Sequence, residues 1–213
     1  MNKKNGFTLA EVLITLGIIG VVAALTIPNL MKVTTGHAFR TAFKEAYSTL
    51  NRAIKTNLSL NSNSDFSTLA SGDFNSYDSI ANMFKERLVV VDTTDSESAP
   101  LEATATVKVS SASNYTLFLN SGVTLGFPQS AQSCDTNTWK TNNCAAIVDI
   151  NGVKGPNKLT NCNSALATDD TAVCTKDNLL FADRFSIRFV GEQVQANGNA
   201  VRAILMNLAV LER

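Results

Sequence analysis

The chain has 213 residues, of which 18 are basic and 18 acidic, and it contains a single histidine. This length suits one compact domain with a short additional segment, so a second domain is not required. The balanced charge and the lack of a basic stripe with interleaved aromatic residues argue against direct nucleic-acid binding. The sequence also has no Walker loop, dinucleotide fingerprint, nucleophile elbow or H-E-x-x-H motif, so it predicts no enzyme and requires no cofactor.

The first element is an apolar segment at residues 7–27 whose only charge is Glu11. At the rise of an α-helix this segment is about 30 Å long, which is the length that crosses a membrane. A secretory signal has a shorter apolar core followed by a small-residue cleavage site, so it does not fit this segment. Lys3 and Lys4 predict that the N-terminus lies in the cytoplasm and that everything after Pro28 lies across the membrane.

Glu11 needs an explanation, because a carboxylate near the centre of a bilayer costs about 3 kcal/mol on insertion scales. Such a group normally has a partner and a function. The alternative is a plain single-pass anchor in which the Glu11 side chain reaches toward the membrane surface.

The order Lys3-Lys4-Asn5-Gly6-Phe7-Thr8-Leu9-Ala10-Glu11 resembles the start of type IV pilins and of type II secretion pseudopilins. The resemblance implies that a prepilin peptidase cuts after Gly6 and that the new Phe7 amine is methylated. It also implies that Glu11 pairs with the Phe7 amine of a like subunit when a filament assembles.

The same resemblance implies a leader at 1–6 and a transmembrane helix at 7–28 in the bacterial inner membrane. The expected function is that of a non-catalytic subunit of a type II secretion pseudopilus or related filament. An inner-membrane platform with a cytoplasmic ATPase would drive the assembly. The alternatives are a type IV pilin for adhesion, motility or DNA uptake, and a membrane-anchored binding protein that uses the prepilin pathway.

Beyond the membrane, apolar side chains recur at spacings of three and four, which predicts that the helix continues over 29–57 on the periplasmic side. These side chains are Phe39, Phe43, Tyr47, Leu50 and Ile54. We expect Pro28 and Gly36 to be points of bending. Two separate helices are the alternative, and either arrangement ends near Asn57.

The rest of the chain, 58–213, is predicted to form a globular head. A polar loop is followed by a short helix capped by Asp78, with Ile80, Met83, Phe84, Leu88 and Val91 on its apolar face, and then by a solvated loop at 92–100. Strand patterns occupy 103–109, 115–119, 123–127, 145–150 and 184–190, and Asn120-Ser121-Gly122 marks a hairpin turn. The last apolar run, from Ala200, favours a short helix over a final strand. The expected fold class is α+β, with a long N-terminal helix and a small antiparallel sheet in a pilin-like head.

Four cysteines, Cys134, Cys144, Cys162 and Cys174, all follow the membrane segment, where oxidation is expected. Four thiols allow three connectivities, and we favour adjacent pairing of Cys134 with Cys144 and of Cys162 with Cys174. Zinc is the competing interpretation. The intervals between the cysteines are longer than those of C-x-x-C zinc sites, which argues against it.

A second motif, D-x-N-G-x-x-G-P-N, begins at Asp149 and is similar to the C-terminal part of many pseudopilins. In this chain a stretch with two cysteines separates the motif from Asp183, and Ala182 occupies the place where a glycine is expected. Asp149, Asn151 and Asp183 offer the oxygen ligands that calcium prefers, which predicts a calcium site. Asx turns explain the same residues as a structural turn, and we favour that interpretation.

Overall fold

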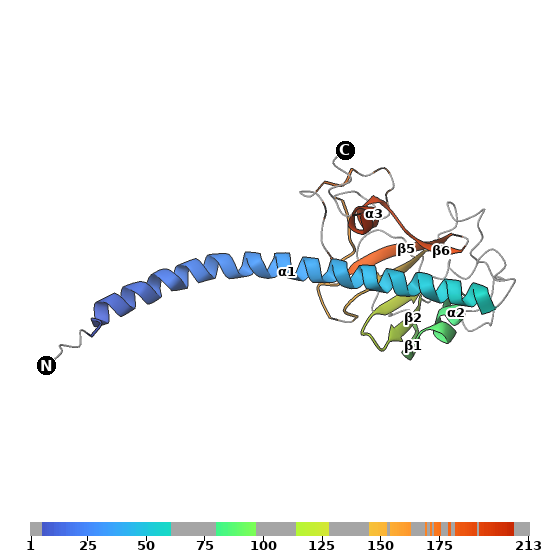
Figure 1. Cartoon of the computed structure of the whole chain (residues 1–213), viewed down its shortest axis with the longest axis horizontal. Helices are drawn as coiled ribbons and strands as arrows, with labels where there is room; N and C mark the ends of the chain where they lie inside the picture. The colour runs from blue at the N-terminus through green and yellow to red at the C-terminus, as the bar shows by residue number, and fades with distance from the viewer. Residues whose placement is uncertain are drawn as a thin grey trace. The chain divides into compact units, whose positions relative to one another are not determined.

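The computed structural model describes residues 6–60, 80–96, 114–127, 145–152, 154–162, 182–190 and 192–206, together with 169, 171, 173–175 and 179. The fold is α+β, as predicted: a long helix, α1 (Leu9–Leu60), precedes a six-stranded antiparallel sheet and two short helices (Figure 1). The chain forms two compact units, Met1–Ala38 and Phe39–Arg213, which are described separately. We refer to the second unit as the head.

Helix α1 is continuous through Pro28 and ends at Leu60 instead of near Asn57, so the alternative of two separate helices is not observed. In the first unit, the part at Leu9–Pro28 is long and apolar enough to cross a membrane, with a mean hydropathy of 2.3. The hydroxyls of Thr15 and Thr26 donate to backbone carbonyl oxygens one turn earlier, at 2.9 Å in both cases. The hydroxyls are therefore satisfied within the helix, as a lipid environment requires.

The sheet of the head contains the predicted hairpin. Strands β2 (Asn114–Leu119) and β3 (Thr124–Phe127) pair in antiparallel register around a turn at Gly122, whose φ of 85° favours glycine. Strands β4 (Ala145–Asp149) and β5 (Arg184–Val190) follow the predicted segments closely. All six strands are neighbours in sequence order, so each pair is joined without a crossover.

Strand β1 (Val90–Ser96) corrects one expectation, because Val91 was predicted on a helix and 92–100 as a loop. Helix α2 (Ile80–Arg87) ends before Val91, and the following segment pairs with β2. The β-branched residues from Val89 to Thr94 favour an extended backbone, and the ladder to β2 supplies its hydrogen bonds. The register shifts between Val90 and Asp92, which places Val91 at a bulge.

Strand β6 (Gln193–Ala196), which the sequence analysis did not predict, forms the opposite edge of the sheet. Two side chains of α1 bond to its backbone at Val194. The Tyr47 hydroxyl donates to the Val194 carbonyl oxygen at 2.6 Å, and the Val194 amide donates to Asn51 Oδ1 at 2.9 Å. These bonds use backbone groups that an edge strand otherwise leaves open, so they fix α1 over this side of the sheet.

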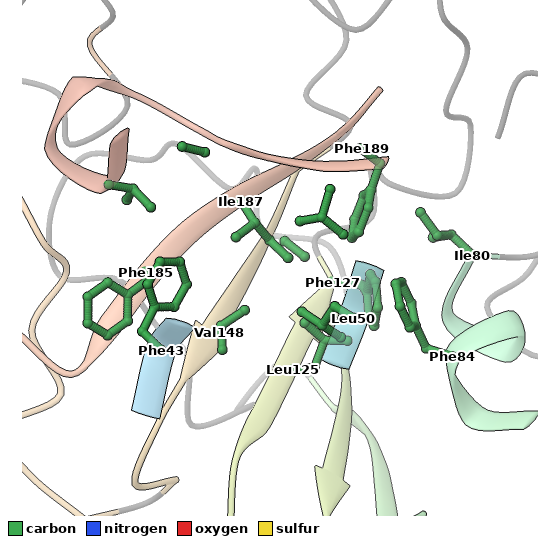
Figure 2. Close-up of a cluster of buried hydrophobic side chains, with 14 of the residues drawn as sticks. Phe43, Leu50, Ile80, Phe84, Leu125, Phe127, Val148, Phe185, Ile187 and Phe189 are labelled. Carbon is green, nitrogen blue, oxygen red and sulfur yellow. The ribbon is translucent and has the colours of Figure 1, made fainter. Parts of the chain in front are cut away.

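The core of the head lies between the second half of α1, the short helices α2 and α3 (Asn199–Met206) and one face of the sheet (Figure 2). Phe43 of α1 stacks on Phe185 of β5, with ring centroids 4.2 Å apart. Phe84 of α2 packs with Phe127 and Phe189 from two strands. Leu50 and Ile54 of the predicted apolar stripe are also buried, so the periodicity of α1 identified its core face.

The final apolar run forms a helix, α3 (Asn199–Met206), as favoured from the sequence. In Figure 1, α3 lies beside β5 and β6, whereas α2 lies beside β1 and β2. The predicted strand at 103–109, the Asp78 cap, Cys134 and Cys144 lie outside the described residues.

Candidate functional site

The three predicted calcium ligands lie in one region of the head, around the loop after β4. Both carboxylates, however, already have partners within the protein. Asp149 Oδ2 lies 2.8 Å from Nε of Arg184, and both side chains are buried. The two oxygens of Asp183 accept the backbone amides of Asn157 at 2.8 Å and Lys158 at 2.7 Å. The Asn151 side-chain amide donates to the Gly155 carbonyl at 3.0 Å, which closes the turn.

Arg184 is a residue of this region that the sequence analysis missed, since it was seen only as the start of a strand. Asp149 and Arg184 face one another in the antiparallel register of β4 and β5. Burial raises the pKa of the Asp149 carboxyl above its usual value, while Arg184 acts in the opposite direction and Asp183 adds to the increase. The arrangement is a buried ion pair that joins the end of β4 to the start of β5.

The neighbouring segment is fastened by a disulfide between Cys162 and Cys174, which is one of the two predicted adjacent pairs. Both cysteines are buried and belong to the hydrophobic core of the head. The bond therefore anchors the residues after the calcium-like loop to the same core as β5.

The start of α1 has a different geometry, that of a helix capping box formed by Thr8 and Glu11. The backbone amide and the hydroxyl of Thr8 donate to Glu11 Oε2 at 2.8 Å and 2.7 Å. The Glu11 amide donates to the Thr8 hydroxyl at 3.3 Å. This reciprocal pattern satisfies amide groups that a helix N-terminus leaves open.

The capping box gives Glu11 a partner within its own chain, which the sequence analysis did not assign. The T-x-x-E spacing of Thr8 and Glu11 was the available signal. Glu11 remains exposed, so the carboxylate is accessible to a cation from another molecule. Phe7 is 90% exposed, and open space surrounds Gly6, so the peptide bond between them is accessible as well.

Comparison with protein families decides what this N-terminus is. Residues 1–27 match the model of the prokaryotic N-terminal methylation motif. The chain has the N-terminus of a pilin-like prepilin. No curated protein and no solved structure matches the chain. The assignment therefore rests on the motif and on the apolar helix that overlaps it.

For a pilin-like prepilin, the motif implies processing by prepilin peptidase and assembly with like subunits. Gly6 and Phe7 flank the expected cut, and Glu11 is the charged residue of the apolar helix that follows. The motif and the helix at Leu9–Pro28 fit a membrane-anchored, single-pass protein.

The calcium site in the head stays a prediction, and titration with calcium tests it. In the described part of the chain, no cluster of three or more acidic, histidine or cysteine side chains is arranged to hold a metal. Because Asp149 and Asp183 already have partners, we expect millimolar calcium to leave the melting temperature unchanged. A calcium-dependent increase that Asn151→Ala abolishes would instead establish a site, since a ligand that binds only the folded state stabilises it.

Proposed function

We propose that the protein is a non-catalytic subunit of a type II secretion pseudopilus or a closely related filament. In this proposal prepilin peptidase cuts after Gly6, and the apolar part of α1 holds the subunit in the inner membrane until it is polymerised. The head then lies outside the cytoplasm. The observation that carries the proposal is the methylation motif at residues 1–27, which overlaps the apolar helix at Leu9–Pro28.

The chemistry of the N-terminus supports an assembly role. Cleavage after Gly6 creates an amine at Phe7, four residues before the exposed Glu11 carboxylate. In the single subunit this carboxylate accepts hydrogen bonds only from neutral Thr8 groups, among the bonds that the structure describes. An amine from a neighbouring subunit would add a charged partner, and an ion pair is stronger in lipid than in water. Assembly would thereby favour one register between subunits.

Lys3 and Lys4 support the proposed orientation, because basic residues remain on the cytoplasmic side of a membrane helix. The cysteine pair supports it independently. A disulfide between Cys162 and Cys174 suits an oxidising compartment, which the outside of the inner membrane provides.

A type IV pilin for adhesion, motility or DNA uptake is the second candidate, because the same N-terminal motif serves both kinds of filament. The test is to produce the full chain in two hosts, one with a secretion-type and one with a pilus-type assembly platform and ATPase. We expect sheared filaments that contain the protein only with the secretion-type machinery. Filaments only with the pilus machinery would favour the second candidate, and failure to polymerise in both would favour a membrane-anchored binding protein.

A further inference from the structure

We draw no further inference here: the strongest candidate, the open groove in the head between α1 and the turn that joins β2 to β3, is lined by small and apolar side chains together with both Glu45 and Arg87, and nothing in the structure shows what covers it.

Discussion

Replacing Glu11 with valine is expected to abolish incorporation into filaments while leaving the subunit inserted and processed. The carboxylate is the only charge in an apolar helix, and its pairing with a Phe7 amine would be worth on the order of 3 kcal/mol in lipid. A loss of this size corresponds to about a hundredfold weaker addition of each subunit. The measurement is the amount of Glu11→Val protein in sheared filaments relative to the membrane fraction.

The capping box provides the control for this experiment. Thr8→Val removes the hydroxyl that donates to Glu11 but keeps the carboxylate, so it isolates capping from pairing between subunits. Loss of such a cap costs about 1 kcal/mol, so we expect a much smaller effect on assembly than with Glu11→Val. Equal incorporation of Glu11→Val and the native chain would remove the pairing argument.

Removing one partner of the buried pair between Arg184 and Asp149 is expected to destabilise the head strongly. Arg184→Met leaves the Asp149 carboxylate buried without its cation, which costs about 3 to 5 kcal/mol of the free energy of unfolding. The double variant Arg184→Met with Asp149→Leu removes both charges and should recover most of this loss. Urea denaturation of the membrane-extracted full chain measures all three proteins. A single variant as stable as the native chain would contradict the structural role of the pair.

The pH dependence of stability is an additional readout of this pair. Because the pKa of Asp149 is raised in the folded state, the folded protein binds this proton more tightly than the unfolded chain does. The resulting stabilisation is complete below the unfolded pKa of about 3.9 and is lost as the pH rises through the folded pKa. Asp149→Asn cannot titrate, so we expect a flatter stability profile over this acidic range. If Asp149→Asn had the same profile as the native chain, the Asp149 carboxyl would not contribute to the pH dependence of stability.

Local signals predicted the elements whose pattern is complete within a few residues. The apolar spacing from Phe43 to Ile54 identified the core face of α1, and Asn120-Ser121-Gly122 located the hairpin. Strand β1 was missed because Val91 also fits the helical spacing of Met83, Phe84 and Leu88, and only pairing with β2 resolves the ambiguity. Strand β6 has four residues, and its edge is satisfied by Tyr47 and Asn51, far away in the sequence.

The difference between local patterns and contacts that join distant residues also explains which parts of the candidate sites were predicted. The N-terminal motif is contiguous, so it was recognised without a fold, and the roles of Gly6, Phe7 and Glu11 stay predictions that follow from it. The partner of Asp149 was not predicted, because Arg184 is 35 residues away in the sequence. Arg184 lies opposite Asp149 only because of the register of β4 and β5. A groove of about 510 Å³ beside α1 is likewise invisible in the sequence, since it arises where small residues of the helix, such as Ala42 and Ala46, face the distant hairpin turn at Asn120.

Intact mass and N-terminal sequencing of the protein from membranes of a host with a prepilin peptidase test the central claim most directly. The account predicts a chain that begins with N-methylated Phe7 and has lost residues 1–6. The mass should also be lower by two hydrogen atoms for each disulfide, including the bond between Cys162 and Cys174. A chain that still begins with Met1 would contradict the prepilin pathway and indicate a simple membrane anchor.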